Sequence, residues 1–145
     1  MKTTAISYPF RVMVDTSFWI ALYDIKDRRH SEAVDRESVL TISNVILPWP
    51  ILYETLRTRF VKRPWGLQFR LLLSTLQVSH VCDTPYRQRA YDDTVSDSNV
   101  RRGISMVDML IRLMLEDKSL GITHLLTFNV KDFEDVCRER RIELV

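Results

Sequence analysis

Short apolar runs that alternate with longer helical patterns are the feature that most constrains the fold of this chain. The runs cover residues 11–14, 45–47, 78–82, 122–128 and 142–145, and Val, Ile and Leu are frequent in them. Strands that are continuously apolar, rather than alternating apolar and polar, are typical of a parallel sheet with two buried faces. The alternation therefore predicts an α/β domain in which a central parallel sheet carries helices on both faces.

Local signals indicate where the helices between these runs begin and end. Ser105 is an expected N-cap, Pro64 suits a first helical turn, and Gly121 is expected to stop a strongly apolar helix. The expected helices cover residues 16–24, 30–40, from Pro50 to 61, 64–76, 85–98, 105–118 and 131–140.

Nothing in the sequence divides the chain into separate units. Its 145 residues suit one domain of ordinary size, and we expect a single domain over residues 1–145. The longest apolar run, residues 45–53, is broken by Pro48 and Pro50, so we expect no spanning helix, no membrane partner and a cytoplasmic location. With three glycines and two distant cysteines, we expect no glycine-rich phosphate loop, disulfide framework or zinc site.

Basic residues gather in one segment although the net charge of the chain is only +2. No Asp or Glu occurs between Thr55 and Cys82, where the basic residues include Arg57, Arg59, Lys62 and Arg63. A basic segment in a nearly neutral protein is compatible with contact to a polyanion. A solvated helix face explains the same pattern, and the segment alone does not decide between them.

Asp15 directly follows the first apolar run, in the sequence Val-Asp-Thr-Ser-Phe. In parallel sheets, functional groups lie just beyond the carboxyl ends of the strands, which makes Asp15 a candidate metal ligand. An Asp that precedes a helix also caps it by accepting hydrogen bonds from exposed amides. Both interpretations stay open from this residue alone.

Asp108 lies in a narrow polar strip on a helix that is apolar around most of its circumference. The strip also contains Ser105, Arg112 and Glu116. A single polar strip on such a helix indicates a cleft, a partner or solvent. The same spacing suits a capping box from Ser105 to Asp108 and a ladder of ion pairs, so a purely structural role is equally possible.

The other candidate positions are weaker when each is taken alone. Helical spacing places Leu52, Tyr53 and Leu56 on one apolar face and Glu54 off it, as expected for a surface glutamate. Asn129 and Asp132 follow the apolar run 122–128, where Asn129 would cap the last helix with Asp132 at its third position.

Taken together and in order, these motifs resemble the PIN-domain family. They are Asp15 with Thr16-Ser17 after the first strand, Glu54 after the second, Ser105-x-x-Asp108, and Thr127-x-Asn129-x-x-Asp132-Phe133 after a late strand. The likeness spans the whole chain. Its compact form resembles the toxin component of VapBC-type toxin–antitoxin pairs.

The resemblance implies a three-layer α/β/α domain and an endonuclease that uses Mg²⁺ or Mn²⁺ to cleave single-stranded RNA. It gives Asp15, Glu54 and Asp108 as the catalytic and metal-binding residues. The fourth acidic position of the family falls on Asn129, so Asn129 or Asp132 would serve there. Thr16, Ser105 and Thr127 would support the carboxylates, and Arg57, Arg59, Lys62 and Arg63 would bind RNA. The expected partners are an antitoxin protein and a second copy of the chain.

Several other functions are compatible with the sequence. A PIN-type nuclease without an antitoxin would serve RNA processing, and a non-catalytic module would only bind RNA. A phosphatase of the haloacid-dehalogenase type needs a second Asp two residues after Asp15, where this chain has Ser17, so we do not favour it.

Overall fold

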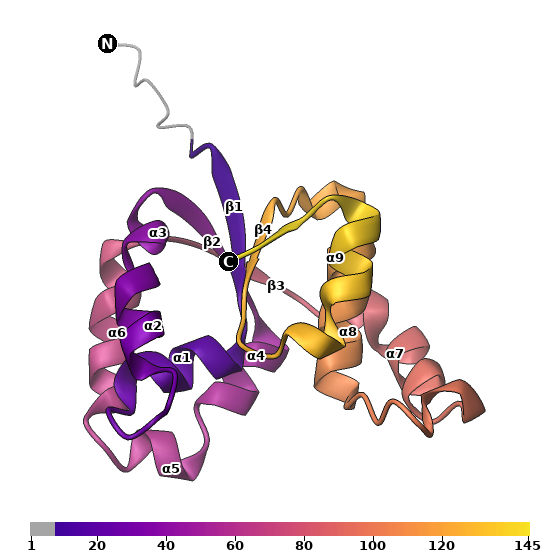
Figure 1. The fold of residues 1–145 in the computed structure, drawn as a ribbon, viewed down its shortest axis with the longest axis horizontal. Coiled ribbons are helices and arrows are strands. Elements are labelled where there is room, and N and C mark those ends of the chain that lie inside the picture. The colour runs from indigo at the N-terminus through magenta and orange to yellow at the C-terminus, as the bar shows by residue number, and fades with distance from the viewer. Residues whose placement is uncertain (1–7) are drawn as a thin grey trace.

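The computed structural model describes residues 8–145, and its strands form one five-stranded sheet (Figure 1). The strand order is β3-β2-β1-β4-β5, and every neighbouring pair is parallel. The strands are β1 (Phe10–Val14), β2 (Ser43–Pro48), β3 (Gln77–Val81), β4 (His124–Leu126) and β5 (Glu143–Leu144). The predicted α/β class and its parallel sheet are confirmed.

Helices connect the strands and cover the sheet. They are α1 (Thr16–Tyr23), α2 (His30–Arg36), α3 (Ser38–Thr41), α4 (Trp49–Thr55), α5 (Thr58–Val61), α6 (Trp65–Thr75), α7 (Arg87–Thr94), α8 (Met106–Glu116) and α9 (Glu134–Arg140), with short 3₁₀ turns η1 (Thr84–Tyr86), η2 (Asp97–Asn99), η3 (Lys118–Leu120) and η4 (Val130–Asp132). Within residues 8–145, no helix is long and apolar enough to cross a membrane.

Helices lie on both sides of the sheet, as expected for a three-layer domain. Figure 1 shows α1, α2 and α6 on one side and α8 with α9 on the other. The central strands supply the core, because Val12, Met13 and Val14 of β1 are fully buried together with Val45 and Ile46 of β2. This burial on both faces explains why the strand sequences are continuously apolar.

Four of the expected helices are divided in the structure, among them residues 131–140, which η4 and α9 share. The helix expected from Pro50 to residue 61 breaks after α4, where Leu56 and Arg57 leave the helical conformation. The break lets α5 place Phe60 in the core, where its ring packs edge-on against Tyr23 and Phe69. Burying an aromatic ring outweighs the helical hydrogen bonds lost at the break. Similar divisions separate α2 from α3, and α7 from its flanking turns.

An ion pair joins α8 to α9. The guanidinium of Arg112 donates to both carboxylate oxygens of Asp135, at 2.7 and 2.9 Å, and to the carbonyl of Asp132 at 2.6 Å. The side chain of Arg112 is 12% exposed and that of Asp135 is 41% exposed. This bidentate bond holds the pKa of the Asp135 carboxyl far below its usual range. The expected ladder of ion pairs along the polar strip of α8 is therefore wrong, because Arg112 pairs with Asp135 of α9 rather than with Asp108 or Glu116.

We predict that Asp135→Asn lowers the free energy of unfolding by about 1–2 kcal/mol at neutral pH, because the largely buried Arg112 loses its charged partner. A carboxyl group whose pKa is lowered by folding stabilises the fold fully at a pH above its ordinary pKa of about 4. This stabilisation is lost progressively as the pH falls below that value. The difference between the variant and the natural protein should therefore shrink in acid. Urea denaturation between neutral and acid pH measures this difference, and Glu134→Gln in the same helical turn is the control. A gap that is constant with pH would contradict the assignment.

Candidate active site

The candidate site lies at the carboxyl edge of the sheet, where the chain crosses from one half of the sheet to the other. β1 pairs with β2 on one side and with β4 on the other, so helices leave β1 and β4 in different directions. Such a switch point opens a crevice beyond the strand ends. Asp15 follows β1 and Thr127 follows β4, and the amide of Asp15 donates to the carbonyl of Leu126 at 3.0 Å.

The carboxylate of Asp15 is buried and held by two hydroxyl groups. Ser17 and Thr127 each donate to the same oxygen, Oδ2, at 2.9 Å, and only 3% of Asp15 is exposed. Asp15 occupies the N-cap position of α1, but its side chain makes no capping hydrogen bond. The capping interpretation is therefore wrong for this side chain, which is bound by Ser17 and Thr127 instead.

Ser17 belongs to the motif that the sequence contains, but the sequence interpretation gave it no role in the candidate site, where it holds Asp15. Besides holding Asp15, its hydroxyl accepts a hydrogen bond from the amide of Phe128 at 3.0 Å, which links α1 to the segment after β4. Its position two residues after the strand-end Asp was a usable signal, because hydroxyl side chains near a helix start bond readily to neighbouring polar groups.

Glu54 and Asp108 complete an acidic cluster with Asp15. One carboxylate oxygen from each of the three side chains lies within 4.8 Å of the others. Glu54 comes from α4, which follows β2, and Asp108 comes from the first turn of α8. The predicted trio therefore meets in space although its members are far apart in the sequence. The apolar face predicted for α4 was wrong, because Tyr53 is 70% exposed while Thr55 is buried.

The cluster is electrostatically strained. Burial, together with the charges of Asp15, Glu54 and Asp132, raises the pKa of Asp108 to about 7. Burial also raises the pKa of Glu54, opposed by the neighbouring Thr16 hydroxyl and increased by the charge of Asp15. None of the ion pairs formed by residues 8–145 includes a member of the trio. Among residues 8–145, no paired cation thus neutralises these carboxylates.

This donor set fits a divalent cation. Carboxylate oxygens are the hard ligands that Mg²⁺ prefers, and one oxygen from each of the three side chains lies within 4.8 Å of the others. Three carboxylates that meet without a paired Arg or Lys repel one another, and a cation removes that repulsion. Asp15, Glu54 and Asp108 are accordingly the residues that would hold the metal.

The predicted supporting hydroxyls have three different positions. Thr127 binds Asp15 directly. The Thr16 hydroxyl lies beneath α4, 3.1 Å from the hydroxyl of Thr55 and 3.4 Å from the carbonyl of Ile51. The hydroxyl of Ser105 accepts from the Asp108 amide at 3.2 Å, so Ser105 is the N-cap that the sequence predicted and orients the start of α8.

Asn129 and Asp132 lie at the fourth corner of the site and bind each other. The side-chain amide of Asn129 donates to Oδ2 of Asp132 at 2.7 Å, while the backbone amide of Asn129 donates to Thr127. Asp132 is near enough to raise the pKa of Asp108, yet it lies outside the group of three whose oxygens converge. The expected capping of the last helix by Asn129 is wrong, because α9 begins only at Glu134.

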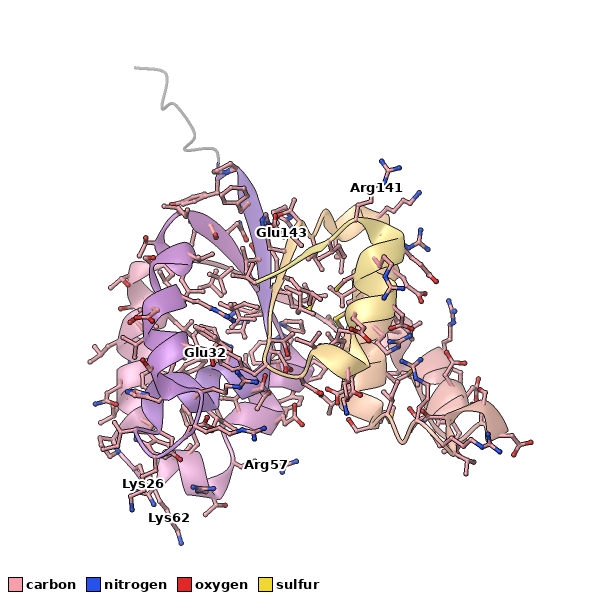
Figure 2. All side chains as sticks on the ribbon, viewed as in Figure 1. Lys26, Glu32, Arg57, Lys62, Arg141 and Glu143 are labelled. Atoms are coloured by element: carbon pink, nitrogen blue, oxygen red, sulfur yellow. The ribbon has the colours of Figure 1, made fainter. Side chains whose placement is uncertain are left out.

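One residue of the basic segment, Arg57, lies near the acidic cluster. Arg57 is close enough to Glu54 for its charge to lower the carboxyl pKa. Figure 2 shows Arg57 and Lys62 extending from the end of the molecule that contains α5. Arg59 pairs with Asp24 at 3.3 Å, and the guanidinium of Arg63 lies 4.9 Å from the centre of the Trp65 ring.

Comparisons with known proteins identify the fold. No protein-family model matches the chain, and a search of curated proteins finds no significant match. Among solved structures, the chain is similar to VapC20 of Mycobacterium tuberculosis, described as a toxin that cleaves the sarcin-ricin loop. The TM-score is 0.65 and the identity 22%, over 83% of this chain and 92% of that one. This likeness confirms the predicted PIN-like fold.

We predict that Thr127→Val weakens the binding of Mn²⁺ about 10- to 100-fold, because Asp15 loses a hydroxyl that fixes its orientation. Isothermal titration calorimetry measures the affinity. Thr127→Ser keeps the hydroxyl and should bind Mn²⁺ almost as tightly as the natural protein. Equal affinities for the Val and Ser variants would show that this hydrogen bond does not support a metal site.

Proposed function

We propose that this protein is a metal-dependent endoribonuclease that cleaves single-stranded RNA with Mg²⁺ or Mn²⁺. The observation that carries the proposal is the convergence of Asp15, Glu54 and Asp108, without a paired cation, at the switch point of the sheet. The similarity in fold to VapC20, described as a toxin that cleaves an RNA loop, supports the same conclusion. Both the geometry and the fold thus favour hydrolysis of a phosphodiester.

The residues of the site have separable roles. Asp15, fixed by Ser17 and Thr127, would be the most rigid metal ligand, while Glu54 and Asp108 close the other sides. When bound, a divalent cation stabilises negative charge on the phosphate and lowers the pKa of water for attack. Asp132, which accepts a hydrogen bond from Asn129, would hold a water molecule by a hydrogen bond to its carboxylate.

The basic residues around α5 are suited to hold the RNA backbone. Arg57, Arg59, Lys62 and Arg63 are all exposed, and Arg57 lies beside Glu54. Their guanidinium and ammonium groups bind phosphates without regard to sequence. A single strand that enters along α5 would therefore present one phosphodiester to the carboxylates.

We predict that the purified protein cleaves single-stranded RNA in Mn²⁺ and that EDTA abolishes the cleavage. Asp15→Asn and Asp108→Asn should each reduce the rate by at least about 100-fold, because each removes a charged ligand of the metal. Gel analysis of a labelled RNA measures the rates. Asp92→Asn is a matched control, since Asp92 is an exposed carboxylate on α7 outside the trio. Cleavage that survives both active-site substitutions unchanged would contradict the proposal.

Within this function, we favour the toxin of a toxin–antitoxin pair, with an antitoxin protein as partner. The compact form that spans 92% of VapC20 supports this choice. An RNA-processing nuclease without an antitoxin has the same site. The uncompensated trio argues against a module that only binds RNA, because a carboxylate cluster by itself repels phosphate.

We predict that expression of the natural protein alone arrests bacterial growth and that Asp15→Ala relieves the arrest. Counts of viable cells after induction measure the effect, with immunoblots to show equal amounts of both proteins. Normal growth with the natural protein at full abundance would argue against the toxin assignment and leave the nuclease assignment to the cleavage assay.

A further inference from the structure

A cavity of about 330 Å³ opens directly beside the carboxylate cluster. Glu54 belongs to both, because it lines the cavity and contributes an oxygen to the acidic trio. Any group that fills the cavity therefore lies next to the phosphate that the trio would receive. Its volume falls at the small end of the range for ligand-binding pockets.

The walls of the cavity are apolar and aromatic, and its rim is basic. Ile20, Phe60 and Trp65 form the apolar part, while the exposed side chains of Arg57 and Arg59 border it. An aromatic wall next to guanidinium groups suits a nucleotide, whose base stacks on a ring while its phosphates pair with the cations. An aliphatic or acidic occupant would use only one of these two features.

The polar floor of the cavity has its hydrogen bonds satisfied within the protein. The hydroxyls of Thr16 and Thr55 lie 3.1 Å apart and bond to each other. Among residues 8–145, the buried polar side-chain atoms that lack a partner belong to Trp19, Tyr23 and Asn44, and none of these lines the cavity. Because the floor has no buried unpaired polar group to read a base edge, binding would depend mainly on stacking and show little base preference.

A second cavity of about 370 Å³ adjoins the first and shares Arg59 and Trp65 with it. Lys26 and Arg63 line this second cavity, and Figure 2 shows Lys26 at the same end of the molecule as Arg57 and Lys62. The two cavities thus form a path from Glu54 toward Lys26 on which basic side chains predominate, although Asp24, which pairs with Arg59, also lines the second cavity. A strand of RNA can continue along this path from the first cavity.

We propose that the cavity lined by Glu54 and Trp65 is a subsite that holds the nucleobase next to the cleaved phosphodiester, with Trp65 as its stacking residue. This inference rests on the proposed ribonuclease function. It assigns to Trp65 a role in positioning the substrate, and to Arg57 and Arg59 the flanking phosphates.

Cleavage of RNAs that each lack one base tests this subsite. In the natural protein, one abasic position beside the cleaved bond should slow cleavage about tenfold, the typical effect of losing one stacked base. Trp65→Leu should slow cleavage of the intact RNA by a similar factor, and the abasic substitution should then cause no further loss. Trp65→Phe keeps an aromatic wall and should retain the abasic effect, which separates stacking from a folding defect.

Trp49→Leu is the matched control. Trp49 is an exposed tryptophan that stacks on His80, with ring centres 5.0 Å apart, and it does not line the cavity. The abasic effect should persist in this variant. The inference would be overturned if the abasic substitution slowed cleavage by the Trp65→Leu variant as much as it slows cleavage by the natural protein. It would also be overturned if Trp49→Leu, and not Trp65→Leu, removed the abasic effect. Absence of any cleavage of the intact RNA would count against the proposed function instead.

A binding measurement tests the subsite apart from catalysis. The protein for this measurement carries Trp49→Phe and Asp108→Asn and is studied with Mn²⁺. Its two remaining tryptophans are Trp19, which is fully buried, and Trp65, which is half-buried. Addition of a short oligoadenylate RNA should quench the fluorescence of Trp65, and Trp65→Phe in this background should abolish the quenching. Binding of the RNA, detected by anisotropy, without any quenching would overturn the inference.

Discussion

The pairing of β1 with β4 is the interaction on which the site depends. It brings the end of β1 beside the end of β4, so that the amide of Asp15 binds Leu126 and its carboxylate binds Thr127, 112 residues away in the chain. Ser17 closes the same junction from α1 by bonding Asp15 and the amide of Phe128. A carboxylate that is 97% buried is stable only with such partners, and the strand order supplies them.

The basic side chains of residues 8–145 form no ion pair with Asp15, Glu54 or Asp108, so the negative charge of the trio is not neutralised by them. Arg112 lies one helical turn from Asp108, but its guanidinium donates hydrogen bonds to the carboxylate of Asp135 and the carbonyl of Asp132. Arg57 lies near Glu54 and its charge lowers the pKa of that carboxyl, but the two side chains form no ion pair. The positive groups therefore fasten helices or lie near the trio, whose carboxylates stay uncompensated. This separation favours a metal centre over a structural ion-pair network.

The parts of the site that the sequence predicted least well depend on contacts between distant segments. Periodicity placed Glu54 on a surface because it treated residues 50–61 as one helix. The break after α4 changes which side faces inward: Tyr53 is exposed, Thr55 is buried over Thr16, and Glu54 meets Asp15. Asn129 was expected to cap a helix, yet a 3₁₀ turn intervenes and its amide binds Asp132. Such details follow from tertiary packing, which local propensity does not contain.

The sequence by itself determined the parallel α/β class, the position of Asp15 at a strand end and the cap at Ser105, because apolar periodicity and capping chemistry are local properties. It also contained, in order, the acidic residues that meet at the site. Only the tertiary structure decided that three of them converge within 4.8 Å, that Ser17 supports Asp15, and that a cavity with an aromatic wall begins at Glu54. Convergence depends on strand order and helix breaks, which join residues that no local pattern relates.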